Sequence, residues 1–177
     1  MGAQVGVATV LTNLGIVEYE FGNYAEAKSF MQESLEISER FGNQTDIAAS
    51  MYSLGRVAYA LGENEEAHHY WVRGLRLAQQ TMFVEFKLNC LVGLATVFYQ
   101  QGDSQEALRL AGIVKPHLDE STEAQGRFDE LLSLLETTVS EDELTKTFEA
   151  GKALDWDEEI AALLAQFEED EEIKAVA

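Results

Sequence analysis

Few side chains in this sequence could carry out chemistry, and their spacing argues against a catalytic or metal site. His68 and His69 are adjacent, so on a helix they would point about 100° apart, unlike the one-face pair of histidines that binds a metal. His117 stands alone beside Pro116, and Cys90 is the only cysteine and has no obvious neighbour that would stabilise a thiolate. We therefore interpret His68 and His69 as surface residues and Cys90 as a buried or half-buried thiol.

Acidic residues are abundant, and pairs of them could serve as glycosidase carboxylates or calcium ligands. The D-x-D-x-D-G loop of a calcium site is absent, however. The segment DWDEEI from Asp155 to Ile160 is better explained by the start of a helix, where negative side chains meet the positive end of the helix dipole. No catalytic triad, phosphate loop or cysteine-pair metal site is recognisable. The sequence therefore predicts a protein that is not an enzyme and that uses no metal or cofactor.

The formal net charge of the 177-residue chain is −20, and most of it lies in the last third. Residues 121–177 hold 17 acidic against 4 basic residues, whereas residues 1–120 hold 15 against 8. A surface this negative repels phosphate backbones and anionic lipid headgroups, so we expect neither a nucleic acid nor a membrane as a direct partner. The sequence shows no signal peptide and no apolar run of membrane-spanning length, which predicts a cytoplasmic protein.

Three segments of the chain match one another at a constant spacing of 40 positions. Their shared landmarks are a leucine, a small residue, a tyrosine, a glycine and an alanine. In chain order these are Leu14, Leu54 and Leu94; Gly15, Gly55 and Ala95; Tyr19, Tyr59 and Tyr99; Gly22, Gly62 and Gly102; and Ala27, Ala67 and Ala107. Apolar residues recur at spacings of three and four, and proline is nearly absent, so each repeat is predicted to be a pair of antiparallel helices.

The size of each landmark residue predicts its role. The small residues and the alanines let neighbouring helix axes approach closely, and the glycines supply the backbone freedom that ends the first helix of each pair. Asn23 with Glu26, and Asp103 with Glu106, have the spacing of capping boxes that open the second helix. The turn between the two helices is therefore predicted residue by residue.

The repeat pattern stops at Pro116, which cannot continue helical hydrogen bonding. Three more helices are predicted beyond it: one around residues 122–139, one from Ser140 with Glu143 as its capping box, and one from near Asp155. They would cover the apolar end of the array. The predicted organisation is three helical hairpins over residues 1–116, a helical capping region over 117–167, and an acidic tail over 168–177 that is expected to fray.

Over about residues 5–116 these landmarks resemble the signature of the tetratricopeptide repeat family. The resemblance implies an all-α fold, an α-solenoid of three 40-residue helix-turn-helix repeats followed by a helical C-terminal cap. Two features depart from the family: Leu11, Met51 and Leu91 replace an early aromatic residue, and the period exceeds the basic unit of about 34 residues. The lengthened repeats and the region after Pro116 look like the arrays of large bacterial signal-transduction ATPases and transcriptional regulators.

By this resemblance, the first helix of each repeat lines a concave groove that binds a peptide, a helix or a partner domain. The implied groove residues are Thr12, Ile16, Tyr19, Tyr52, Arg56, Tyr59, Asn89, Val92, Thr96 and Tyr99. Tyrosine offers a large contact area at low entropy cost, and Arg56 could meet a carboxylate. The three tyrosines could equally be packing residues between helices, and both interpretations stay open.

The leading hypothesis is a non-catalytic protein-interaction or sensor module of a larger bacterial regulatory protein. One alternative is a structural module that self-associates, or packs against other domains of its parent chain and holds them inactive. A second alternative is a sensor of a small ligand. Gly2–Ala8 aligns with Gly42–Ala48, so we expect the chain to begin inside a joint between repeats, where exposed Val7, Val10 and Leu11 could pair two copies as a homodimer.

Overall fold

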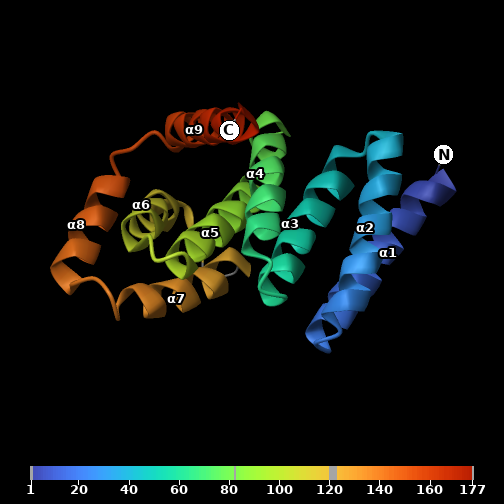
Figure 1. Ribbon diagram of the computed structural model, residues 1–177, viewed down its shortest axis with the longest axis horizontal. Coiled ribbons are helices and arrows are strands. Elements are labelled where there is room, and N and C mark those ends of the chain that lie inside the picture. The colour runs from blue at the N-terminus through green and yellow to red at the C-terminus, as the bar shows by residue number, and fades with distance from the viewer. Residues whose placement is uncertain (1, 82, 120–122, 177) are drawn as a thin grey trace. The chain divides into compact units, whose positions relative to one another are not determined.

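The computed structural model describes residues 2–81, 83–119 and 123–176, and every regular element in these ranges is a helix. This confirms the predicted all-α fold of the solenoid type (Figure 1). The chain forms two compact units, unit 1 (Met1–Gly93) and unit 2 (Leu94–Ala177). The boundary between the two units falls within one helix, α5 (Val84–Gln100).

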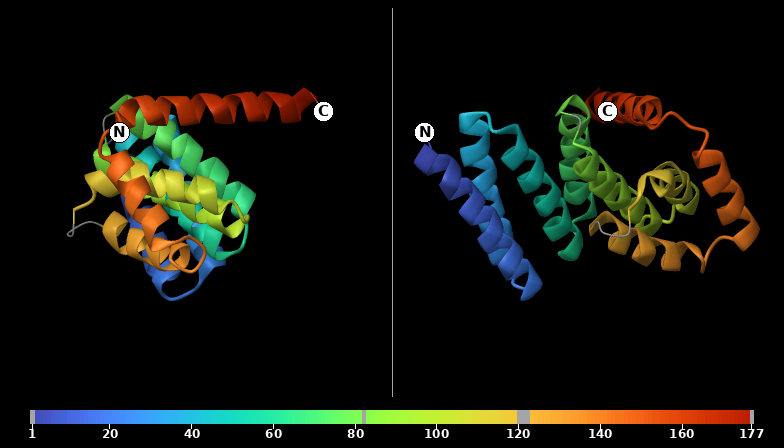
Figure 2. Two further views of the ribbon diagram at one scale, coloured as in Figure 1. Left: turned by 90° about the vertical axis from the view of Figure 1, so that its left-hand side faces the viewer. Right: turned by 180° about the vertical axis from the view of Figure 1, so that it is seen from behind.

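Unit 1 contains two complete helical hairpins and the first part of the third. Its helices are α1 (Gly2–Glu20), α2 (Tyr24–Phe41), α3 (Gln44–Ala60), α4 (Asn64–Thr81) and the beginning of α5. Successive helices lie side by side in chain order, α1 on α2, α2 on α3 and α3 on α4 (Figures 1 and 2). Helix α1 is therefore the end of the stack in this unit.

The turn inside each hairpin is closed by a glycine, as predicted. Gly22, Gly62 and Gly102 have φ angles of 79°, 78° and 87°, in the left-handed region that side chains with a Cβ rarely adopt. The amide of each glycine donates a hydrogen bond to the carbonyl of the landmark tyrosine three residues earlier. The prediction that these glycines end the first helices is confirmed.

Of the two predicted capping boxes within the repeats, one forms its cap and one does not. The side chain of Asp103 accepts a hydrogen bond from the amide of Glu106 at 3.0 Å. Asn23 makes no such cap, because its side-chain amide instead donates to the carboxylate of Glu18 at 2.7 Å. The capping role predicted for Asn23 is therefore wrong.

Small residues bring the helices of each hairpin together, as predicted. A Cβ added to Gly15 would lie 2.7 Å from the side chain of Met31, and one added to Gly55 would collide with the indole of Trp71. Met31 and Trp71 occupy equivalent positions in the first and second repeats. The large side chain that packs on the small residue therefore recurs with the repeat as well. The indole of Trp71 also lies against Gly93, whose added Cβ would approach it to 2.5 Å. Trp71 is fully buried between these two glycines.

Unit 2 contains the end of α5 and the helices that follow it. These are α6 (Ser104–Val114), the 3-10 turn η1 (Lys115–His117), α7 (Glu123–Leu135), α8 (Glu141–Gly151) and α9 (Trp156–Val176). The last three curve around α6 (Figure 1). The backbones of α6 and α8 meet at Gly112 and Gly151, where no Cβ would fit. Helix α8 of the region after Pro116 thus packs against α6 of the third hairpin, and the predicted boundary after Pro116 stays a prediction.

The helices after Pro116 begin close to where the sequence predicts. Ser140 accepts a hydrogen bond from the amide of Glu143 at 3.3 Å, and Asp155 accepts one from Glu158 at 3.2 Å. Helix α9 continues to Val176 and so includes most of the acidic stretch, whose fraying stays a prediction. Glutamate and alanine are good helix formers, and their propensity outweighs like-charge repulsion worth only tenths of a kcal/mol per pair.

Side chains from the end of α5, from α6 and from η1 hold α9 in unit 2. The ring of Phe98 stacks on Phe167, and Arg109 pairs with Glu159 at 3.3 Å. The imidazole of His117 stacks on Trp156, with ring centroids 4.2 Å apart. Burial in this stack lowers the pKa of His117 below its ordinary value, although the nearby Asp157 acts in the opposite direction.

Candidate functional site

The groove residues implied by the sequence fall into an accessible group and a buried group. Ile16 is 37% exposed, and the half-buried ones are Tyr19, Arg56, Tyr59, Thr96 and Tyr99. The side chains of the other four are at most 8% exposed: Thr12, Tyr52, Asn89 and Val92. The expectation that these four lie on an exposed surface is wrong.

Thr12 is buried because it belongs to a cluster of hydroxyl groups between α1, α2 and α3. Its hydroxyl lies 2.8 Å from that of Ser34, which also donates to the carbonyl of Ala8 at 2.7 Å. Ser50 donates to the hydroxyl of Ser34 at 3.3 Å. These buried hydroxyls satisfy one another, as buried polar groups must, and they fix the approach of three helices without offering a surface to a partner.

The other buried positions have a different cause. Residues 87–95 of α5 are all buried, so this part of the helix has no solvent-facing side on which Asn89 or Val92 could be presented. Tyr52 lies in α3 beside Trp71, whose indole donates to the carbonyl of Tyr52 at 3.3 Å. Tyr52, Asn89 and Val92 stand at positions that line the groove in the family, but in this chain they are packing residues.

The accessible groove residues of unit 1 gather around Arg56. Its guanidinium lies 4.4 Å from the ring centre of Tyr19 and 5.8 Å from that of Tyr52. A nitrogen of the same group lies 3.6 Å from the carboxylate of Glu20, which is itself mostly exposed. Aromatic faces and a loosely paired carboxylate thus hold a positive charge on the face shared by α1 and α3. We call Ile16, Tyr19, Glu20, Arg56 and Tyr59 the α1–α3 face.

The two tyrosines of this face also take part in packing. The ring of Tyr19 lies 5.3 Å from that of Tyr24 in α2, and the ring of Tyr59 lies 6.1 Å from the indole of Trp71. Both side chains remain half-buried, so one side of each ring packs and the rest stays accessible. Tyr99 belongs to unit 2, where its hydroxyl lies 3.3 Å from that of Thr137. The ladder of three tyrosines therefore stays a prediction.

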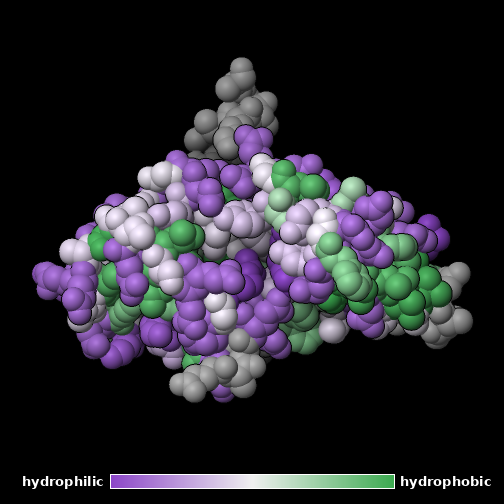
Figure 3. Space-filling model, turned by 90° about the horizontal axis from the view of Figure 1, so that it is seen from below, coloured by the Kyte–Doolittle hydropathy of each residue, from purple (hydrophilic) through white to green (hydrophobic). Residues whose placement is uncertain are grey.

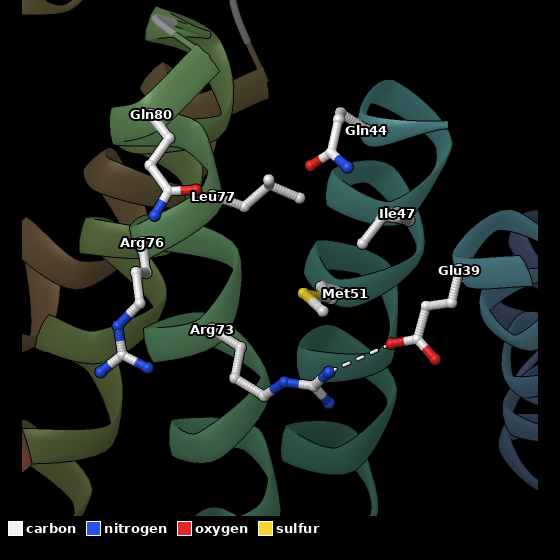
Figure 4. A pocket seen from close by; sticks show the side chains of 8 residues that line it. All are labelled: Glu39, Gln44, Ile47, Met51, Arg73, Arg76, Leu77 and Gln80. Atoms are coloured by element: carbon white, nitrogen blue, oxygen red, sulfur yellow. Dashed lines mark hydrogen bonds and ion pairs between the residues drawn. The ribbon is translucent and has the colours of Figure 1, made fainter. Parts of the chain in front are cut away.

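A pocket of about 220 Å³ lies on another side of unit 1, where α4 faces α3 and the end of α2 (Figure 4). Apolar side chains of Ile47, Met51 and Leu77 line it, with polar groups around them. Arg73 extends across it to Glu39, with which it forms an ion pair of 3.1 Å, whereas Arg76 runs along α4 away from α3. The pocket is smaller than the 300–1,000 Å³ typical of small-molecule sites.

The sequence analysis did not identify this pocket, although the repeat contains a signal for it. Arg73 and Arg76 occupy the positions in the second repeat that Glu33 and Glu36 occupy in the first, so the charge is reversed at both. Comparing the repeats for their differences, and not only for their shared landmarks, would have indicated a local positive region on this acidic chain.

Ion pairs between consecutive hairpins reinforce unit 1 next to the α1–α3 face. Lys28 of α2 reaches Glu63 at 2.6 Å and Glu66 at 2.5 Å. Partial burial alone would lower the pKa of Lys28, but the hydrogen bonds that its ammonium donates to the two carboxylates raise it above its ordinary value. The same bond to Lys28 lowers the pKa of Glu63.

The remaining residues that could carry chemistry include Cys90, His68 and His69. Cys90 is a fully buried free thiol, as predicted. His69 is exposed and His68 is half-buried. Among the described residues, no three or more histidine, cysteine, aspartate or glutamate side chains gather in a way that could hold a metal ion. Nor does any helix of this part combine the length and the apolar character that crossing a membrane requires.

Comparison with known proteins identifies the repeats. Residues 6–80 match a family model described as tetratricopeptide repeat, and residues 88–112 match a second model with the same description. A search of curated proteins gives no match. Repeats of this family generally mediate protein–protein interactions and are typically non-catalytic. The chain thus carries tetratricopeptide repeats over residues 6–80 and 88–112.

Proposed function

We propose that unit 1 binds an extended or helical segment of a partner protein on its α1–α3 face, with Arg56 as the central contact. The position of this guanidinium supports the proposal most strongly. Two aromatic rings restrict it, and the ion pair that it forms with the exposed Glu20 is long at 3.6 Å. A restricted arginine loses less conformational freedom on binding than a mobile one, and arginine and tyrosine dominate the energy of many interfaces.

The chemistry of this face favours a partner segment that carries both a carboxylate and an apolar side chain. A carboxylate of the partner can replace Glu20 as the ion-pair partner of Arg56 and form a closer, bidentate contact. An apolar side chain beside it would cover Ile16 and the accessible edge of Tyr19. Glu20 would then disfavour segments that lack a carboxylate able to displace it, so the same residue contributes to specificity.

A selection from random peptides tests this proposal without knowledge of the natural partner. Peptides displayed on phage would be selected on the immobilised chain, and their affinities for the wild type and for two variants would be measured by titration calorimetry. Arg56→Ala is expected to weaken binding about tenfold to a hundredfold, as loss of a central arginine typically costs about 2 kcal/mol.

Arg73→Ala provides the matched control, because it removes an equal charge from the pocket between α3 and α4. It is expected to leave the affinity nearly unchanged. Equal affinity of the selected peptides for the wild type and for Arg56→Ala would refute the α1–α3 face as the binding site. Circular dichroism would show that both variants keep their helical content.

We further infer that the module belongs to a cytoplasmic bacterial regulatory protein, in which the partner segment can lie in another domain of the same parent chain. The lengthened, 40-residue repeats support this setting. The small-ligand alternative has little support in unit 1, because the pocket beside Arg73 is small and its inward-facing cation is already paired. In unit 2, pockets of about 350 Å³ and 530 Å³ beside Arg109 have the size of small-molecule sites, so the alternative stays open there. A thermal-shift screen with a metabolite panel tests that alternative.

A further inference from the structure

Helix α1 carries a continuous apolar stripe that no described residue of unit 1 covers. Its five members recur at spacings of three and four residues, and each is between 43% and 76% exposed: Val7, Val10, Leu14, Val17 and Phe21. The patch at the right-hand side of Figure 3 shows this region over the end of unit 1. Leu11, which the sequence analysis placed on the exposed edge, is buried.

The internal repeat shows what kind of element fits such a stripe. Of the residues that lie 40 positions later, Ile47, Ser50, Leu54 and Val57 belong to α3 and are buried. The fifth, Leu61, lies just beyond α3, as Phe21 lies just beyond α1, and is 41% exposed. In unit 1 the helix that packs on α3 from the side of the preceding hairpin is α2. The stripe on α1 therefore has the shape and spacing of a surface that receives another helix.

We propose that the stripe pairs with the same stripe of a second copy of this chain, with the two α1 helices antiparallel and Leu14 on the two-fold axis. The stripe is nearly symmetrical about this residue: Val10 and Val17 lie four and three positions away, and Val7 and Phe21 lie seven positions away. A reversed second copy then meets it with a matching set of side chains. An interface of this kind is self-complementary and closed, as a two-fold dimer requires.

The charges of α1 favour this second copy and this direction. The helix has no charged residue before Glu18, so its stripe can approach another helix without burying an ion. Glu18 and Glu20 lie together at one end. In a parallel pair the Glu18 carboxylates of the two copies would lie side by side, whereas in the antiparallel pair they lie roughly 12 Å apart along the axis, beyond one Debye length at physiological salt.

The size of the stripe determines how strong the pairing can be. Stable interfaces bury about 800 Å² on each partner, and five side chains of one helix supply less than that. A chain of net charge −20 also repels its copies at long range. The dimer should therefore be weak, so the fraction of chains in it should rise with protein concentration. Its affinity should increase as salt screens the repulsion.

Cysteine cross-linking tests both the pairing and its direction. Leu14→Cys is expected to form a disulfide-linked dimer under mild oxidation, because the two sulfurs meet at the axis. Val10→Cys and Val17→Cys should each cross-link poorly with itself and efficiently with the other. A tag on one of the two variants distinguishes the mixed dimer by mass. The wild-type chain gives the background, since its Cys90 is buried.

Ile16→Cys is the matched control, because Ile16 is exposed on the same helix but lies about 160° around the axis from Leu14. Sedimentation equilibrium from about 10 µM to 1 mM, in low and high salt, measures the uncross-linked dimer over the range of weak affinities. Efficient cross-linking of Val10→Cys with itself would overturn the antiparallel arrangement. A monomer at every concentration, or cross-linking no faster than that of Ile16→Cys, would overturn the pairing itself.

Discussion

At the scale of single residues, the pairing of glycine with a large partner explains how closely the helices of unit 1 approach. Trp71 lies between Gly55 and Gly93, and a Cβ on either would collide with the indole ring. Gly55 could be predicted from the sequence, because it is a landmark of the repeat. Gly93 could not, because it stands two positions before the third landmark, Ala95, and its contact with Trp71 depends on how α5 packs within unit 1.

Gly55→Ala is expected to destabilise the protein by about 1–3 kcal/mol, since the added methyl group has no free space beside Trp71. The free energy of unfolding in urea, followed by circular dichroism, measures the effect. Gly126→Ala is the control: it lies in α7 with no atom within 4 Å of the added Cβ, and it should be neutral or stabilising. Equal effects of the two substitutions would contradict the packing described for Trp71.

The exposure of part of the candidate site could not be predicted correctly from residue types alone. Arg56 and Tyr19 could be predicted as accessible, and the structure adds that the guanidinium lies over the tyrosine ring. Thr12 was predicted to be accessible too, but its hydroxyl meets two serine hydroxyls inside the unit, and this depends on which residues the neighbouring helices bring there. Tyr52 and Val92, at the same repeat position, are buried as well, so burial at this position follows the repeat.

At the scale of helices, the boundaries could be predicted well because glycine and capping residues act locally. The failure of one predicted cap has a physical reason. Asn23 and Asp103 stand at the same place in the first and third repeats, yet Asn23 has an amide that can donate, and it bonds to Glu18 of the preceding helix. The carboxylate of Asp103 has only acceptors and accepts from the helix that follows it, whereas Asn43 both donates to Asp46 and caps α3.

The difference between these two positions can be measured. Asp103→Ala is expected to cost about 0.5–2 kcal/mol of unfolding free energy, because it removes the cap of α6. Asn23→Ala should cost less, since it removes only an exposed bond between side chains and no cap. Urea unfolding of the two variants provides the comparison, and a larger loss for Asn23→Ala would show that the caps are assigned wrongly.

At the scale of the whole molecule, the sequence predicted the fold class because the repeat is specific and recurs three times. It could not predict that the division into compact units would fall inside α5, because this depends on how helices far apart in the sequence pack together. It also predicted a module that holds a partner. We propose that the α1–α3 face of unit 1, centred on Arg56, is the surface that holds it.

Hydrogen exchange tests this central claim most directly. The amides of the chain would be compared by mass spectrometry with and without a saturating peptide obtained from the phage selection. The account predicts that slowed exchange concentrates in the second half of α1 and in α3, around Tyr19 and Arg56. Protection confined to α4 beside the Arg73 pocket, or to unit 2, would contradict it.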